Sequence, residues 1–194
     1  MNYKIHVAVF ISGAGTNARN IIQYFRNHER IDISLIISNK ADSGALQISR
    51  DTGVPFYIMT REEFYDKNKI IEILHAHKVQ SVVLAGFLWL VPANLIRLYP
   101  NRMINIHPAL LPKYGGKGMY GMRVHQAVKA AGDTSTGITI HLVNEEYDKG
   151  RVLLQKSVEV ESSDTPEAIA QKVHQLEYDF FPKVIEEHLL KEFS

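Results

Sequence analysis

The chain has 194 residues, of which 45% are hydrophobic, and this is enough for one domain with a continuous core. Its 22 lysines and arginines nearly balance its 21 aspartates and glutamates, so it has no strong overall field for a nucleic acid or an anionic membrane. Because there is no cysteine, disulfides and thiolate metal sites are excluded. The absence of cysteine permits a reducing compartment, and we expect a single domain, 1–194, in the cytoplasm.

Two apolar stretches could imitate membrane or export signals. The longest one, 82–96, is interrupted by Gly86, Pro92 and Asn94 and is shorter than the ~20 residues of a spanning helix. The run 5–11 follows a lysine in the manner of a signal peptide, but His6 and the glycine turn after the run favour a first strand. We expect no membrane partner.

The amino-terminal third alternates strand and helix patterns. The β-branched run 5–11 leads through a glycine turn into the helical pattern 18–25. Strand patterns at 31–37 and 55–59 lie on either side of a short helix at 45–51. This alternation predicts a Rossmann-like α/β fold, with a mostly parallel twisted sheet and helices on both faces.

The middle of the chain should supply the centre of the sheet. Thr60, followed three residues later by Glu63, predicts a capping box that opens a helix with Phe64, Ile71 and Leu74 on its inner face. The segment 81–85 is so apolar that we expect a doubly buried central strand. The segment 87–91 should then cross the top of the sheet before the next strand, 102–106.

The last third begins with an irregular segment. Four glycines within 114–121 predict a mobile loop, followed by a helix at 124–131 and a strand at 137–143. The strand 151–160 is interrupted by polar residues and should be antiparallel to its neighbour and less buried. Thr165 and Pro166 predict the start of the last helix. Its apolar residues that step by three or four should face the sheet: Ile169, Val173, Leu176, Phe180 and Val184.

Asn105 and His107 come at the end of the strand 102–106, directly before a proline. Side chains alternate along a strand, so these two share one face while Ile104 and Ile106 point into packing. Open α/β sheets bind ligands at the carboxyl ends of their strands. An amide donor and an imidazole that exchanges protons therefore share one patch, although two polar residues that merely close the sheet edge remain an alternative.

The glycine turn at 12–17 satisfies a loose dinucleotide-binding fingerprint. That fingerprint also needs an acidic residue at the end of the second strand, where the chain has Ser-Asn-Lys at 38–40, so a nicotinamide cofactor is disfavoured. Backbone N–H groups of Gly15, Thr16 and Asn17 could instead hold one phosphate. A plain tight turn is the alternative.

Asp148 lies in a turn after a strand that should neighbour 102–106. If its carboxylate reaches His107, it fixes the tautomer of the ring, favours imidazolium and raises the pKa of the imidazole. An aspartate before Lys-Gly can also be purely structural. We interpret His125 and His141 as helix-surface and strand residues, and no spacing of histidines or carboxylates indicates a metal site.

Several motifs, in order and spacing, resemble the phosphoribosylglycinamide formyltransferase family, folate-dependent enzymes of purine synthesis. The resemblance covers about 5–185. The motifs are Ser12-Gly13-Ala14-Gly15-Thr16-Asn17, Ser38-Asn39-Lys40-Ala41-Asp42, Leu84-Ala85-Gly86-Phe87, the stretch 105–114 that begins Asn-Ile-His-Pro, and Asp148-Lys149-Gly150. Asn-x-His-Pro with a distant Asp marks the wider formyltransferase superfamily, whereas the glycine turn resembles the more specific phosphate site of the ribonucleotide substrate.

The resemblance implies direct transfer of the formyl group of 10-formyltetrahydrofolate, a co-substrate, to the amine of glycinamide ribonucleotide through a tetrahedral intermediate. Asn105 would donate to the developing oxyanion, and His107 would help to stabilise it and act as general acid toward the leaving folate nitrogen. Asp148 would keep His107 charged and aimed. The resemblance implies no metal, no covalent intermediate and no partner beyond small-molecule substrates, for a monomer or a homodimer.

Further site residues follow from the resemblance by position, with a phosphate-binding half at about 1–100 and a folate and catalytic half at about 101–194. The ribonucleotide would contact Gly15, Thr16, Asn17, His174 and Glu177. The folate pocket would be formed by Arg61, Leu88, Trp89, Leu90, Val91, Asn105, Asn144, Glu145, Glu146, Tyr147 and Asp148.

Two departures from the family pattern matter. Trp89 stands where many members carry a basic residue, so stacking or burial would replace an ionic contact with folate. The loop 114–121 is longer and richer in glycine than is usual.

Three other functions compete with this interpretation. A formyltetrahydrofolate hydrolase would use the same Asn, His and Asp with water as acceptor, but it has no use for a sugar-phosphate turn and normally carries a regulatory domain. The transferase that acts on initiator tRNA would need an RNA-binding domain and a basic surface. A phosphosugar-binding regulator without chemistry would not need Asn105, His107 and Asp148 together.

Overall fold

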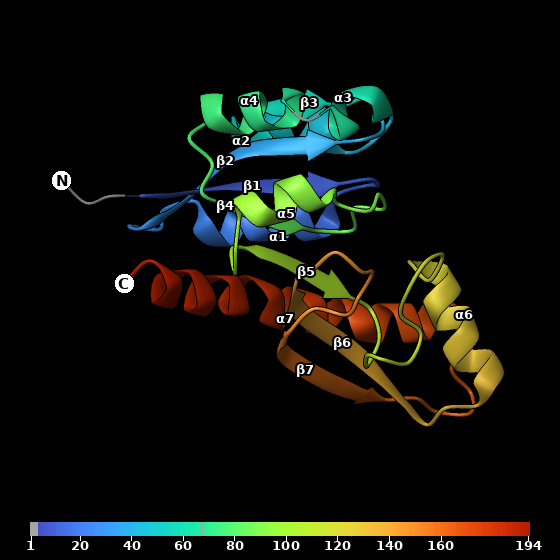
Figure 1. Ribbon diagram of the computed structural model, residues 1–194. Helices are drawn as coiled ribbons and strands as arrows, with labels where there is room; N and C mark the ends of the chain where they lie inside the picture. Colours follow the sequence, from blue (N-terminus) through green and yellow to red (C-terminus); the bar gives the residue numbers. More distant parts are fainter. Residues whose placement is uncertain (1–3, 67) are drawn as a thin grey trace.

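The computed structural model describes residues 4–66 and 68–194, and these residues form one sheet with helices on both faces (Figure 1). The strand order is β3-β2-β1-β4-β5-β6-β7. The strands are β1 (Ile5–Ile11), β2 (Ile31–Ser38), β3 (Phe56–Ile58), β4 (Ser81–Leu84), β5 (Met103–His107), β6 (Ser135–Leu142) and β7 (Val152–Glu159). The helices are α1 (Thr16–Phe25), α2 (Ala45–Thr52), α3 (Arg61–Tyr65), α4 (Lys69–Ala76), α5 (Ala93–Leu98), α6 (Met122–Ala131) and α7 (Pro166–Glu192).

The sheet is parallel except at one strand. β1 pairs in parallel with β2 and β4, and β4 pairs in parallel with β5. β6 runs antiparallel to both of its neighbours, β5 and β7. The predicted fold class and the central position of β4 are therefore confirmed. As a consequence, the carboxyl ends of β1, β4 and β5 meet at one edge of the sheet.

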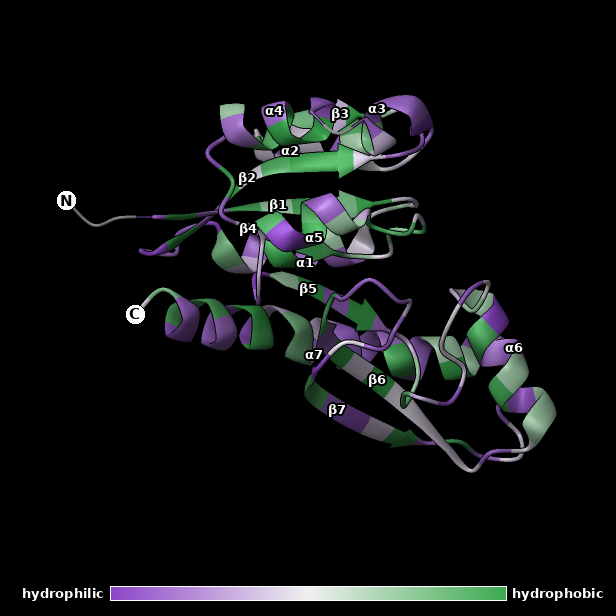
Figure 2. Cartoon of the chain, in the orientation of Figure 1, coloured by the Kyte–Doolittle hydropathy of each residue, from purple (hydrophilic) through white to green (hydrophobic). Residues whose placement is uncertain are grey.

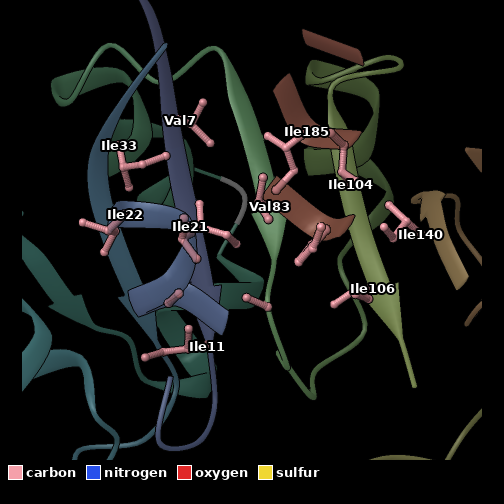
Figure 3. Packing of buried hydrophobic residues seen from close by; sticks show 14 of the residues in the cluster. Val7, Ile11, Ile21, Ile22, Ile33, Val83, Ile104, Ile106, Ile140 and Ile185 are labelled. Carbon is pink, nitrogen blue, oxygen red and sulfur yellow. The ribbon is translucent and has the colours of Figure 1, made fainter. Parts of the chain in front are cut away.

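Alternating side chains of the strands feed two apolar cores. On β1, Val7 and Val9 join a core with α1, α2 and α7, whereas Ala8 and Phe10 join a second core with α3, α4 and α5. Figure 3 shows part of the first core, where Ile104 from β5 lies near Ile185 from α7. Both faces of the central strands are thus buried, which is why their sequences are continuously apolar.

β7 differs from the inner strands in hydropathy and burial. Figure 2 shows hydrophobic residues along β2 and many hydrophilic ones along β7. Most residues of β7 are exposed or half-buried because it is the last strand of the sheet. The expectation of a less buried antiparallel strand is confirmed.

One predicted helix is two helices in the structure. The capping box of Thr60 and Glu63 is present and opens α3. The chain then becomes extended at Asp66, whose carboxylate accepts two backbone N–H groups at the start of α4, at 2.8 and 3.2 Å. This second start shifts the inner face, so Ile70 is fully buried and Ile71 only partly.

Two other expectations need correction. The short helix α5 was not predicted by the sequence pattern. In α7, Ile169 and Val173 are buried as predicted, but the buried face then continues at every fourth residue through Glu177, Phe181, Ile185 and Leu189, and the predicted Leu176, Phe180 and Val184 are only partly buried. The reason is that α7 packs on α1 and α6 as well as on the sheet, so a different face is covered. Across the described residues, none of the helices has both the length and the apolar character needed to cross a membrane.

Ile104→Ala should lower the free energy of unfolding by about 2–5 kcal/mol, because the side chain is 0% exposed in the first core and its loss leaves a cavity. Urea unfolding measures this change. Leu98→Ala, on the exposed surface of α5, is the control and should change stability by less than about 0.5 kcal/mol. Equal effects of the two substitutions would contradict this account of the core.

Candidate active site

A cavity of about 880 Å³ lies at the carboxyl ends of β1, β4 and β5. Its wall combines the glycine turn after β1, the segment after β4, the end of β5, part of the loop before α6, the turn after β6 and two side chains of α7. The structure brings together these residues from the sequence analysis: Gly15, Thr16, Asn17, Leu88, Trp89, Leu90, Val91, Asn105, His107, Asn144, Glu146, Tyr147, Asp148, His174 and Glu177. Arg61 and Glu145 lie outside this wall.

His107 and Asp148 face each other from different elements. His107 ends β5, and Asp148 lies in the turn after β6 with a left-handed backbone, φ 55°. His107 Nδ1 is 3.5 Å from Asp148 Oδ2, and both side chains are largely buried. His107 Nε2 is 2.7 Å from the carbonyl oxygen of Tyr114. Since a carbonyl only accepts, Nε2 carries a hydrogen.

Burial changes the charge balance of this pair. It lowers the pKa of His107 below the ordinary value, while Asp148 and the carbonyl of Tyr114 raise it only in part. Asp148 does raise the imidazole pKa, as expected, but desolvation penalises the imidazolium more, so the net shift of the His107 pKa is downward. The pKa of Asp148 is below its ordinary value: burial raises it, but hydrogen bonding to His141, the charge of His107 and the N–H of Gly116 together outweigh that effect.

His141 is a site residue that the sequence analysis treated only as a strand residue. The antiparallel register places it directly opposite Asn105. Its Nδ1 lies 2.9 Å from the carbonyl oxygen of Leu142, so Nδ1 carries a hydrogen, and its Nε2 lies 3.0 Å from Asn105 Nδ2 and 3.7 Å from Asp148 Oδ1. Asn105 Nδ2 also lies 3.5 Å from Asp148 Oδ1. Only the strand register could have revealed this contact.

The glycine turn lies at the amino end of α1. Gly15 has φ 75°, a conformation that favours glycine, and a Cβ there would lie 2.6 Å from Ile48 Cδ1, so the Ile48 side chain would have to shift. The N–H groups that follow open α1, where the helix dipole favours an anion. Asn17 Nδ2 donates to Glu177 Oε2 at 2.8 Å. Among the buried atoms of the described residues, Asn17 Oδ1 is one that has no protein hydrogen-bond partner.

Two histidines next to the turn have opposite environments. The hydrogen bond of His174 Nδ1 to Glu177, at 2.8 Å, raises the pKa of His174. His125 was expected on the helix surface, but it is buried on α6 and lines the cavity, because α6 turns this face toward α7. Burial lowers the pKa of His125 to about 4. The cavity therefore offers one imidazole that is easily charged beside one that stays neutral.

The other end of the cavity is aromatic. Trp89 packs against Phe64 and Phe87, with ring centroids 5.4 and 6.0 Å away. The guanidinium of Arg61 lies 5.9 Å from the Trp89 ring and 5.4 Å from the Tyr65 ring, so Arg61 reaches this outer rim although it is not part of the wall. Glu145, by contrast, pairs on the surface with Arg97 at 3.1 Å. Within the described part of the chain, no group of three or more histidines and carboxylates is arranged to hold a metal ion.

The fold and this constellation define an α/β protein with an Asn, His and Asp centre beside a glycine turn. The family model described as formyl transferase matches residues 5–185, and the chain belongs to this family. Within the family, the predicted resemblance is confirmed. The chain is 34% identical to the phosphoribosylglycinamide formyltransferase of Bacillus subtilis (strain 168), over 94% of this chain and 93% of that relative.

Other similar proteins carry the same name. The chain is 40% identical to the chloroplastic phosphoribosylglycinamide formyltransferase of Arabidopsis thaliana, over 92% of this chain, and it spans 63% of that relative's length. A crystal structure of phosphoribosylglycinamide formyltransferase from Anaplasma phagocytophilum superposes with a TM-score of 0.85 and 32% identity, covering 94% of this chain and 85% of that one.

Asp148→Asn should lower the pKa of His107 further, because it removes the negative charge that opposes the effect of burial. An NMR titration of the His107 ring measures this shift without any substrate. Asp51→Asn, which removes an exposed carboxylate paired with Arg19 on α1, is the control and should leave the His107 pKa unchanged. A His107 pKa that rises or stays constant in Asp148→Asn would show that the two groups are not coupled.

Proposed function

We propose that the chain transfers the formyl group of 10-formyltetrahydrofolate to the amine of glycinamide ribonucleotide. The observation that carries this proposal is the convergence of Asn105, His107 and Asp148 in one cavity with the glycine turn at the start of α1. The similarity to proteins named phosphoribosylglycinamide formyltransferase supports it. A hydrolase would have no use for an anion site in the same cavity as the reacting groups.

The ribonucleotide would bind at the α1 end of the cavity. Backbone N–H groups of Gly15, Thr16 and Asn17 would hold its phosphate, with the imidazolium of His174 nearby. Glu177 is buried and already accepts from Asn17 and His174, so it fixes both side chains and offers a carboxylate to the ribose or the glycinamide. The unpartnered Asn17 Oδ1 would accept from the same ligand.

The folate would occupy the opposite, apolar end. Segment 88–91 and the turn 144–148 would enclose its ring system, and Arg61 would meet the anionic outer part of the molecule across the Trp89 ring. An aromatic surface stabilises a flat heterocycle by stacking and by excluding water. This arrangement supports stacking at Trp89 in place of an ionic contact.

In the reaction, the substrate amine attacks the formyl carbon, and the carbonyl electron pair moves onto oxygen. Asn105 would donate to this oxyanion by giving up its long 3.5 Å contact with Asp148 while it keeps the 3.0 Å contact with His141. Donors of this kind are worth about 3–4 kcal/mol in acyl transfer. The intermediate collapses when the bond to the folate nitrogen breaks.

His107 and Asp148 would move the protons. The attacking nitrogen would give one proton to ionised Asp148, and the folate nitrogen would take one from protonated His107. Transfer of a proton from Asp148 to His107 would then restore the starting form of both groups. Burial disfavours imidazolium in the free protein. The negative charge that develops on the substrate oxygen would raise the pKa of His107 again, so the imidazolium of His107 would be more stable in the transition state than in the free protein.

The remaining assignments are also part of this proposal. The protein would act in the cytoplasm on small-molecule substrates alone, as a monomer or a homodimer. The part at about 1–100 would supply the phosphate site, and the part at about 101–194 would supply the catalytic groups and most of the folate pocket.

The purified protein should form formylated product from glycinamide ribonucleotide and 10-formyltetrahydrofolate, and hydrolysis of the folate without the ribonucleotide should stay slow. Product formation is followed by mass spectrometry and folate absorbance. His107→Asn should keep the fold and lose most turnover. Fast hydrolysis independent of the ribonucleotide would instead favour the hydrolase, and near-normal turnover of His107→Asn would reject the acid role.

Asn17→Ala should weaken ribonucleotide binding about tenfold or more while folate binding stays nearly intact, because it removes a polar contact next to the phosphate and the partner of Glu177. Calorimetric titration with each ligand measures both affinities. Asn20→Ala is the matched control, since Asn20 also ties α1 to α7, through the carbonyl of Tyr178 at 3.0 Å, but lies outside the cavity wall. Equal loss of both ligands in Asn17→Ala would contradict the phosphate assignment.

A further inference from the structure

The backbone of segment 114–116, at the start of the glycine-rich loop, contacts both members of the catalytic pair. The carbonyl oxygen of Tyr114 accepts from His107 Nε2 at 2.7 Å. The N–H of Gly116 donates to Asp148 Oδ2 at 2.8 Å. Each is shorter than the 3.5 Å between His107 Nδ1 and Asp148 Oδ2, and both come from main-chain atoms only two residues apart. The segment therefore bridges β5 and the turn after β6.

These contacts fix the direction of both side chains. With Nε2 held by Tyr114, the His107 ring must point Nδ1 toward Asp148, 3.5 Å away. With Oδ2 held by Gly116, the Asp148 carboxylate must keep that oxygen toward the ring. A distance of 3.5 Å is too long for a good hydrogen bond, so the pair by itself holds its geometry weakly. The backbone contacts supply the missing restraint.

The segment is itself anchored and close-packed. Tyr114 Oη donates to Asp133 Oδ2 at 2.8 Å, and Lys113 Nζ lies 3.2 Å from both oxygens of the same carboxylate. A Cβ at Gly115 would lie 2.6 Å from Leu111 Cδ2 and 3.4 Å from Asp148 Cβ. Gly116 has φ 94°, a conformation that glycine adopts without strain. The glycines at 115 and 116 thus let main chain lie directly on the pair.

We propose that segment 114–116 is a positioning element for catalysis, which holds His107 and Asp148 facing each other through one carbonyl and one N–H. This inference rests on the proposed function, in which both groups act on the substrates. It assigns the first part of the glycine-rich loop a fixed role, distinct from any closing movement of residues 117–121.

The segment also favours the charged form of each group. The carbonyl of Tyr114 raises the pKa of His107, and the N–H of Gly116 lowers the pKa of Asp148. The other titratable groups that act on His107 are His141 on β6, which lowers its pKa, and Glu177 on α7, which raises it. A positive charge on His107 also lowers the pKa of His125 on α6, because like charges repel. Segment 114–116 thus stabilises both charges of the pair by hydrogen bonds from one short piece of backbone.

Gly116→Ala tests the proposal. A Cβ at residue 116 meets nothing within 4 Å, so the substitution forces the backbone out of its left-handed conformation without a steric clash. The N–H of residue 116 would then lose its hydrogen bond to Asp148, and the carbonyl of Tyr114 would lose its hydrogen bond from His107. The pKa of Asp148 should rise and that of His107 should fall, each by about one pH unit, the effect of losing one hydrogen bond to a charged group. NMR titration of both side chains measures this without substrate.

Gly118→Ala is the matched control. Gly118 has φ 90° and equal space for a Cβ, but its carbonyl accepts from Arg123 on α6 at 3.5 Å. Whatever its effect on rate, Gly118→Ala should leave both pKa values of the pair at the wild-type positions. Unchanged pKa values in Gly116→Ala, or equal shifts in both variants, would overturn the proposal.

The pH dependence of kcat/KM supplies the functional readout. Activity needs ionised Asp148 and protonated His107, so it rises through the apparent pKa of the first group and falls through that of the second. In Gly116→Ala the rising limb should move to higher pH and the falling limb to lower pH, narrowing the profile. Shifted NMR pKa values with no formyl transfer by the wild-type protein would refute the proposed function alone, whereas a wild-type profile in an active Gly116→Ala would refute the positioning role alone.

Discussion

The antiparallel pairing of β5 with β6 is the constraint on which the site depends. It runs β6 back along β5, so His141 lies opposite Asn105, and the turn after β6 folds back so that Asp148 reaches Asn105 and His107. Gly150 allows this turn, because a Cβ there would collide with the carbonyl oxygen of Leu142. Two short polar segments, 43 residues apart at Asn105 and Asp148, thereby face one cavity.

The polar groups of the site are buried, and burial makes their charged forms less stable. His107, His141 and Glu177 are all nearly inaccessible, and charged groups in such surroundings are stable only when hydrogen bonds and opposite charges compensate for lost water. The compensation comes from several elements at once: a carbonyl and an N–H of the glycine-rich loop, the β6 histidine and the amide of Asn105. A preorganised set of this kind needs little rearrangement when charge develops in the substrate.

The long helix α7 links the glycine turn to the carboxyl-terminal half of the chain. It packs on α1, α6 and β6, and its Glu177 bonds to Asn17, 160 residues earlier in the chain. Glu177 occupies an inward position where an apolar residue would otherwise continue the buried face between Val173 and Phe181. A carboxylate at such a position costs stability unless it is bonded, so its place next to the glycine turn supports a role in ligand binding.

The sequence by itself determined the α/β class, the order of the strands and helices that it predicted, the glycine turn and the strand that carries Asn105 and His107, because local hydrophobic periodicity and turn residues are sufficient for these features. It missed α5 and joined α3 to α4, because helices of five to eight residues are too short to show a helical period of apolar residues. Only the tertiary structure decided that His141 and His125 face the cavity and that burial lowers the pKa of His107. Strand register, the direction of a helix face and loss of solvent arise from contacts between distant segments, and no local pattern encodes them.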